Sequence, residues 1–383
     1  MTAAAVAPAT PQKLALLQHF SGLKDPRQNA KVLYPLDEIV LLLVCATIAG
    51  CDDLVEIGEW GMEHLAFLRR YLPYRDGIPS HDTLGDVVAA VDPEVFKSSF
   101  GAWIADMRDS APDVIAIDGK TSRRTHDRGK GHKPLHLVSA WASRQRLVLG
   151  QQATAEKSNE ITAIPLLLER LLLKGSIVTI DAMGTQTGIA QTILDKGGDY
   201  CLALKENRPV LHGEVATFFT DPEAQGVTRH ETADADHGRL EIRRHAVCST
   251  IGWLHSDRRH PGELNFPGLA MIGRVENETG RDGKTSIERR YFLCSAIMTV
   301  AAFAAVVRAH WGVENRLHWV LNVIFDDDQS RLRTGHAAEN MAIVRHIALN
   351  LMRTTKTKSS LKVRRKKAAW NTRYLADILT GEG

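Results

Sequence analysis

The chain has 383 residues, 48 basic and 45 acidic side chains, and a formal net charge of +3. This length suits two or three domains with at least one large core, and the composition is that of a globular protein, not of a disordered or fibrous one. The longest apolar run, residues 39–49, is too short to span a bilayer, so no membrane association is expected.

The first part of the chain predicts a short unstructured segment followed by helices. Residues 1–11 carry neither a charged leader nor a long apolar stretch, so we expect a disordered start and no signal peptide. Residues 12–110 contain short apolar-periodic segments introduced by helix-starting residues such as Asp53, Ser80 and Asp92. They predict a helical N-terminal domain, which could be a helix-turn-helix or a packing and oligomerisation unit. The five scattered cysteines favour reduced side chains in a cytoplasmic protein.

The middle of the chain alternates between strand and helix patterns. Strands are expected at residues 114–117, 135–142, 146–152, 176–180 and 200–204, and helices at 158–173, with Glu160 in the first turn, and at 187–196. Three sequential strands followed by strands joined through helical crossovers predict a mixed α/β sheet. This is the element order of a ribonuclease H-like core, which we place at residues 111–350.

Two further segments complete the predicted organisation. Alternating patterns and turns predict a β-rich insertion in the core at about residues 209–299, followed by a helix from about 300 to 325. Residues 351–383 are expected to form a basic C-terminal tail, because nine Lys and Arg and no acid lie between Arg353 and Arg373. A basic cluster on a nearly neutral chain favours a polyanionic partner that is contacted at defined places.

Two predicted strands run directly into a carboxylate. The apolar residues 114–117 lead into Asp118 and Gly119, and residues 176–180 lead into Asp181. Gly119 allows a sharp turn or the close approach of a ligand. Carboxylates at the same edge of parallel strands converge and repel, and a divalent cation relieves that repulsion. Oxygen donors without a matching Cys or His cluster favour Mg²⁺ or Mn²⁺ over zinc.

A third carboxylate is offered by the predicted helix at 300–325. Glu314 lies on a face that it shares with His318, and with Asp118 and Asp181 it makes a candidate triad for two metal ions. Two alternatives remain open at this point. Glu314 could pair with Arg308 or His318 on a solvated face, and the third carboxylate could come from Asp326-Asp327-Asp328.

The order of these motifs resembles the DDE transposases of bacterial insertion sequences, in the subgroup of H-repeat-associated proteins. The resemblance covers almost the full length. It rests on Asp25-Pro26-Arg27, Pro79-Ser80-His81-Asp82-Thr83, Ile117-Asp118-Gly119-Lys120, Asp181-Ala182-Met183-Gly184-Thr185-Gln186, Ala203-Leu204-Lys205-Glu206-Asn207, His310-Trp311-Gly312-Val313-Glu314-Asn315 and Leu317-His318-Trp319. It implies Asp118, Asp181 and Glu314 as catalytic metal ligands, a requirement for Mg²⁺, and DNA cleavage with strand transfer.

Around Glu314, the sequence of this chain differs from that of related transposases. Related transposases place Tyr and Arg seven and four residues before the catalytic Glu and Lys seven after it, where this chain has Val307, His310 and Leu321. Other cations must therefore hold the DNA backbone. The expected DNA contacts are Lys120, Arg123, Arg124, Lys205, Arg308, His318, Lys362, Arg364, Arg365, Lys366 and Lys367.

The predicted function is that of an insertion-sequence transposase, which binds the inverted repeats of its element, cuts at the ends and joins 3′-hydroxyls to target DNA. Because two element ends need two active sites, a homodimer on DNA is expected. Two rivals are a ribonuclease H-like nuclease that cuts without joining and a DNA-binding regulator with an inactive nuclease core.

Overall fold

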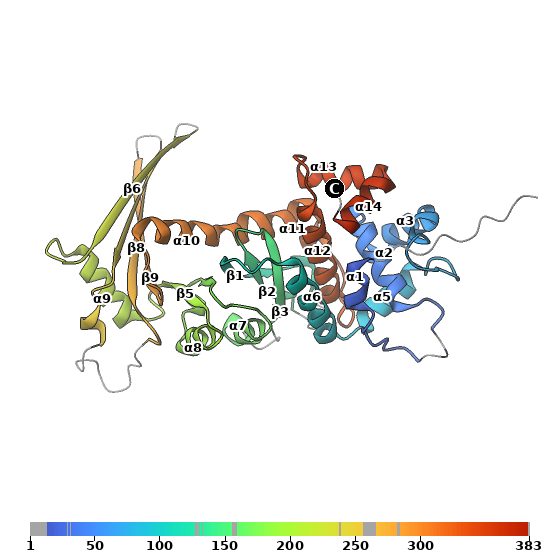
Figure 1. Cartoon of the computed structure of the whole chain (residues 1–383), viewed down its shortest axis with the longest axis horizontal. Helices are drawn as coiled ribbons and strands as arrows, with labels where there is room; N and C mark the ends of the chain where they lie inside the picture. The colour runs from blue at the N-terminus through green and yellow to red at the C-terminus, as the bar shows by residue number, and fades with distance from the viewer. Residues whose placement is uncertain are drawn as a thin grey trace, which may run out of the picture.

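The computed structural model describes residues 14–381 except 29, 31, 127, 128, 130, 132, 155–158, 237, 238, 256–265, 282 and 283. The molecule is elongated (Figure 1): helices from both ends of the chain gather at one end, the first strands of the sheet lie in the middle, and long strands form the other end. Among the described helices, none is long and apolar enough to cross a membrane.

The predicted N-terminal helices are present, and their capping residues were correctly identified. Asp53, Ser80 and Asp92 each accept a hydrogen bond from a backbone N–H of the helix that follows, which satisfies donors that have no partner within the helix. The helices are α1 (Ala15–Phe20), α2 (Leu36–Ala49), α3 (Leu54–Glu63), α4 (Leu65–Leu68), α5 (His81–Ala90) and α6 (Pro93–Met107).

One sheet of nine strands runs through the molecule. Its first five strands are β1 (Val114–Thr121), β2 (His136–Ala142), β3 (Leu147–Ala153), β4 (Ile177–Ile180) and β5 (Asp199–Leu204), in the order β3-β2-β1-β4-β5. β2 is antiparallel to both β1 and β3, whereas β4 is parallel to both β1 and β5. The predicted mixed sheet is therefore confirmed, and α7 (Glu160–Glu169) and α8 (Thr187–Asp195) pack on one of its faces.

The predicted insertion extends this sheet and does not form a separate one. It contains α9 (Pro209–Thr220), β6 (Thr228–Asp236), β7 (Arg239–Cys248), β8 (Met271–Arg281) and β9 (Lys284–Cys294), and β9 pairs antiparallel with β5. The sequence pattern of residues 209–299 did not predict α9 or β6. β6 is the edge strand of the sheet and residues 228–233 are exposed, so this strand lacks the apolar alternation that marks a buried strand.

A nearly continuous helix covers the opposite face of the central strands, as expected for residues 300–325. It consists of α10 (Val300–Gly312), a π-helical segment η5 (Val313–His318) and α11 (Trp319–Ile324). α10 contacts β1 and β4, and η5 contacts β1 and β2. The widened π turn lies over β1, the strand that carries Asp118, and π turns are frequent at functional sites.

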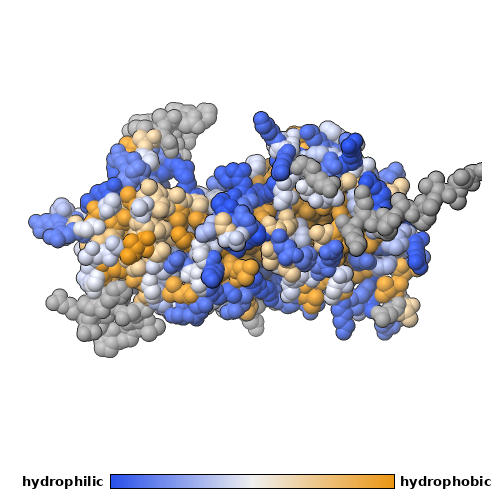
Figure 2. Space-filling model, viewed as in Figure 1, coloured by the Kyte–Doolittle hydropathy of each residue, from blue (hydrophilic) through white to orange (hydrophobic). Residues whose placement is uncertain are grey.

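The last part of the chain, where a basic C-terminal tail was expected, is helical. After α12 (Ala337–Thr354), it folds into α13 (Leu361–Trp370) and α14 (Thr372–Thr380), which pack against α2 and against each other. The apolar side of this pair, with Ala368, Leu375 and Ile378, belongs to the main hydrophobic core. Hydrophilic side chains remain on its outer surface (Figure 2).

Arg365 holds this helical pair to the N-terminal helices. Its guanidinium donates to the carbonyl of Thr47 at 3.0 and 3.2 Å, bonds the carbonyl of Ile324, and forms an ion pair with Asp52 at 2.8 Å. It also lies 4.6 Å from the ring centroid of Phe325. The side chain is 7% exposed, so these partners replace water for a buried charge.

We predict that Arg365→Gln lowers the free energy of unfolding by roughly 2–3 kcal/mol, because hydrogen bonds to a charged buried group are lost and Asp52 loses its partner. Lys366→Gln on the adjacent exposed position should change it by less than about 0.5 kcal/mol. Urea unfolding followed by circular dichroism measures both. Equal stability of the two variants would show that the Arg365 contacts do not anchor the helices.

Candidate active site

The two strand-end aspartates lie at the same place in the sheet. The parallel pairing of β1 with β4 ends at Ile117 and Ile180, so Asp118 and Asp181 each follow the last paired residue. β4 stops there, and the Asp181 side chain accepts from the N–H of Met183 at the start of a 3₁₀ turn. The expectation that both aspartates lie at one edge of parallel pairing is met.

β1 itself continues past Asp118, so of the two roles expected for Gly119, a sharp turn or the close approach of a ligand, the turn is not found. Asp118 and Gly119 pair with Ser139 and Val138 of β2, and the strand runs on to Thr121. Because β4 has already ended, β1 has no parallel neighbour on its other side here. Gly119 leaves space for another side chain: a Cβ atom at this position would lie 2.0 Å from Oε1 of Glu160, which would have to move.

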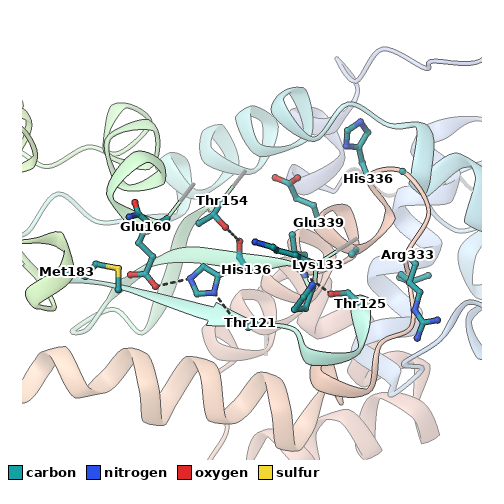
Figure 3. A pocket seen from close by; sticks show the side chains of 16 residues that line it. Thr121, Thr125, Lys133, His136, Thr154, Glu160, Met183, Arg333, His336 and Glu339 are labelled. Atoms are coloured by element: carbon teal, nitrogen blue, oxygen red, sulfur yellow. Dashed lines mark hydrogen bonds and ion pairs between the residues drawn. The ribbon is translucent and has the colours of Figure 1, made fainter. Parts of the chain in front are cut away.

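Glu160 is a carboxylate of the site that sequence reasoning did not select. It begins α7 directly after Asn159, whose side chain caps the helix. Its Oε1 lies 2.8 Å from Nε2 of His136, whose Nδ1 lies 2.7 Å from the hydroxyl of Thr121 (Figure 3). The one available signal was a glycine next to Asp118 together with an acid in the first turn of the following crossover helix.

Glu314 enters the site from the helical layer on the opposite face. It lies on the exposed side of η5. His318, four residues later, is mostly buried and places Nδ1 3.4 Å from Oδ2 of Asp118. The π-helical segment therefore brings Glu314 and His318 to the strand that carries Asp118.

The acids act on one another electrostatically. Burial raises the pKa of Asp118 to about 7, and the charges of Glu160, Glu314 and Asp181 add to this, while the N–H of Gly119 opposes it. Burial and the charge of Glu160 also raise the pKa of Asp181, and nearby Lys205 is among the groups that oppose this rise. The charges of Asp181, Glu160 and Glu314 therefore all reach Asp118, and the charge of Glu160 also reaches Asp181.

The histidines beside the acids are buried and favour the neutral form. Burial lowers the pKa of His318 to about 4, and nearby Lys120 adds to this effect. Burial likewise lowers the pKa of His310 to about 4, while its ring nitrogen lies 2.9 Å from the hydroxyl of Thr179. Val307 and Leu321 are buried as well, so none of the three positions where this chain departs from the wider group presents an exposed cation.

Asp327 forms a buried ion-pair cluster next to the site. It accepts from Ser122 at 2.9 Å and from Arg345 at 3.0 Å, and it pairs with Lys120. Burial opposes ionisation of Asp327, but the charges of Arg345 and Lys120 outweigh it and lower its pKa. Because these partners occupy its carboxylate, the alternative that Asp327 supplies the third catalytic acid lacks structural support.

The expected DNA contacts fall into two groups. Arg123, Arg124, Lys205, Arg308, Lys362, Lys366 and Lys367 are exposed. The other four are engaged inside the protein: Lys120 pairs with Asp327 and Asp328, His318 faces Asp118, Arg364 donates to carbonyls at the end of α12 and beyond, and Arg365 is buried.

The donor chemistry of the site suits a hard divalent cation. Its donors are carboxylate oxygens, and a bound Mg²⁺ or Mn²⁺ would offset the burial and the like charges that together raise the pKa of Asp118. Within the part of the chain that the structure describes, no three His, Cys, Asp or Glu side chains are already gathered closely enough to hold an ion. Asp118, Asp181, Glu160 and Glu314 are the residues that a cation would draw together.

Comparison with known proteins gives consistent matches. Residues 17–104 match the family model described as DDE_Tnp_1-associated, and residues 109–351 match the Transposase DDE domain. The chain is 39% identical over 373 residues to "H repeat-associated putative transposase YhhI" of Escherichia coli K12, covering 96% of this chain and 98% of the relative.

Two further relatives and one solved structure are also similar. "Putative transposase YncI" of Escherichia coli O157:H7 is 39% identical, covering 95% of this chain and 94% of the relative. An uncharacterized protein from the dhlA 3′ region of Xanthobacter autotrophicus is 40% identical over 72% of this chain and 92% of its own length. The piggyBac transposase in a synaptic complex with hairpin DNA aligns with a TM-score of 0.40 at 10% identity, over 94% of this chain and 76% of that one, a likeness too weak to show a common fold.

The raised pKa of Asp118 predicts a pH-dependent cost to stability without divalent cations. The carboxyl keeps its proton in the folded protein up to about pH 7, whereas the ordinary pKa of an aspartate is 3.8. The folded state therefore binds more protons between these values, and stability falls as pH rises through this window. The shift corresponds to on the order of 4 kcal/mol.

We expect Asp118→Asn to remove the loss of stability that ionisation of Asp118 causes as the pH rises. In chelator, the stability advantage of Asp118→Asn over the wild type should grow from pH 4 to pH 7 and then level off, as measured by urea unfolding at each pH. Parallel curves for the two proteins would contradict the assignment of a raised pKa to Asp118.

Proposed function

The chain belongs to the DDE transposase family, and on this premise we propose that it cuts DNA at the ends of an insertion sequence and transfers the 3′-hydroxyls to target DNA. One observation carries the proposal. Asp118 and Asp181 each follow the last residue of the parallel pairing between β1 and β4, and the negative charge of Glu314 lies close enough to help raise the pKa of Asp118. The strand order β3-β2-β1-β4-β5 supports a ribonuclease H-like core.

We propose that Asp118, Asp181 and Glu314 hold two divalent cations, Mg²⁺ or Mn²⁺. Such ions, when bound, activate the attacking water or 3′-hydroxyl and stabilise the leaving oxygen. Mostly buried His318 holds Asp118 from the helical layer at 3.4 Å. We propose that exposed Lys205, which follows β5 and opposes the raised pKa of Asp181, binds a DNA phosphate.

DNA is the proposed partner, through the inverted repeats of the element and the target site. Phosphate contacts position a protein on DNA without reading its sequence, and we assign them to the exposed cations Arg123, Arg124, Lys205, Arg308, Lys362, Lys366 and Lys367. Because each active site processes one end, we propose a homodimer on DNA. A cytoplasmic, nucleoid-associated location follows from the proposed substrate.

We predict that Asp118→Asn, Asp181→Asn and Glu314→Gln each lower cleavage by roughly three decades or more, because each removes a ligand that stabilises the transition state. The substrate is a duplex carrying the sequences that flank the gene, in Mg²⁺ or Mn²⁺. Exposed Asp86→Asn on α5 is the control and should cut normally. Near-normal cleavage by Glu314→Gln would remove Glu314 from the triad.

A strand-transfer assay with the same proteins distinguishes a transposase from the two alternative functions, a nuclease and a DNA-binding regulator. Pre-cut ends with a free 3′-hydroxyl, incubated with a target plasmid, should be joined by the wild type and not by the triad variants. Cleavage without joining would indicate a ribonuclease H-like nuclease. Binding with neither reaction would indicate a DNA-binding regulator.

The exposed lysines of α13 should supply sequence-independent affinity. Each Lys–phosphate contact displaces counterions and contributes about 0.9 to the slope of log affinity against log salt. We predict that replacing Lys362, Lys366 and Lys367 with Gln flattens this slope by roughly two to three units, as measured by fluorescence anisotropy. Preference for element ends over random DNA should change little, since phosphates carry no base information. An unchanged slope in a folded variant would show that α13 does not contact DNA.

A further inference from the structure

We infer that Glu160 is a fourth carboxylate of the catalytic centre, which reaches the cation site from the α7 layer and is held in place by His136. The inference rests on the proposed function, because it assigns a further residue to the same site. Glu160 is not one of the three acids of the proposed triad, and it lies on the opposite face of the sheet from Glu314.

The first support is the position of Glu160 relative to β1. Alternate residues of a strand point to opposite faces, so Asp118 faces the α10–α11 layer, where it meets His318, and Gly119 faces the α7 layer. Glu160 lies over Gly119, and the absence of a Cβ there is what admits its carboxylate.

The second support is the end of β4. Parallel pairing with β1 stops at Ile117, so no strand separates the two faces of the sheet beside Asp118 and Gly119 on that side. A cation beside Asp118 is therefore accessible to carboxylates from both layers.

The third support is the way in which Glu160 is held. Oε1 of Glu160 pairs with His136 at 2.8 Å, and the other ring nitrogen of His136 lies 2.7 Å from the Thr121 hydroxyl. Only one carboxylate oxygen is engaged by these contacts. A carboxylate that is oriented by a histidine through one oxygen keeps the other for a cation, and such supporting contacts fix the geometry of metal ligands.

The fourth support is access. Glu160 and His136 line a cavity of about 610 Å³ together with Met183, the residue whose N–H binds Asp181. Figure 3 shows Met183 beside the Glu160 carboxylate, with His136 on the other side. The Glu160 side chain is 15% exposed, so a hydrated ion can approach it from this cavity.

The test is cation binding by the full chain without DNA. Glu160→Gln keeps the length of the side chain and an oxygen that can accept from His136, and removes only the charge. We expect its affinity for Mn²⁺, measured by calorimetry and by electron paramagnetic resonance of free Mn²⁺, to fall by about tenfold or more. Glu169→Gln, an exposed position at the other end of α7, is the matched control and should bind Mn²⁺ normally.

The positioning role of His136 has its own variants. His136→Phe should weaken Mn²⁺ binding, and His136→Gln, which still donates a hydrogen bond, should recover part of it. Binding kept by His136→Phe but lost by His136→Gln would indicate that His136 merely fills space, and would overturn the positioning role.

Comparison with Asp118→Asn separates this inference from the proposed function. If Asp118→Asn weakens Mn²⁺ binding and Glu160→Gln does not, Glu160 only pairs with His136 and the inference is overturned while the proposed function stands. If Asp118→Asn also binds Mn²⁺ and cuts DNA normally, the proposed function itself fails.

A second measurement uses the wild type and does not depend on the folding of a variant. Fe²⁺ with ascorbate and peroxide cleaves the backbone near a bound ion, so mass spectrometry should find cuts around Gly119, Asp181 and the start of α7. Cuts at the two strand ends without any at the start of α7 would overturn the inference.

Discussion

The burial of carboxylates that lie near other negative charges is the constraint on which the candidate site depends. Asp118 has its pKa raised to about 7 by burial and by the charges of Glu160, Glu314 and Asp181. Such an arrangement costs stability in the absence of cations. The surrounding layers must therefore hold the acids in place by contacts that do not depend on the acids themselves.

Those contacts come from elements distant in sequence. Apolar strands β1 and β4 fix the two aspartates, because Ile115, Ile117, Val178 and Ile180 are buried in the main core. The π-helical turn at Val313–His318 aligns Glu314 and His318 with β1, and its buried Val313 and Leu317 pack into the same core. The rigid sheet and the covering helix thus position the site, which is the role that supporting shells play in catalytic centres.

Basic residues serve two distinct purposes in this chain. Lys120 and Arg345 neutralise buried Asp327, and Arg365 joins α13 to α2 through carbonyls and Asp52. Exposed lysines on α13 remain available to a polyanion. A count of charges along the sequence cannot separate these groups, because burial and hydrogen-bond partners decide whether a cation faces solvent.

The sequence by itself determined the layered α/β architecture, the capped N-terminal helices and the two aspartates that follow the paired residues of β1 and β4, because these follow from local periodicity and capping chemistry. It did not reveal that β1 continues beyond Asp118, because that extension depends on pairing with β2. It also supplied the family, through motifs whose order extends over almost the full chain. The extension of one sheet through β9, the edge strand β6 and the packing of α13 were decided by contacts between distant segments. Glu160 was missed for the same reason: its proximity to Asp118 depends on the place where β4 ends and on the missing side chain of Gly119, which become meaningful only when α7 lies against the sheet.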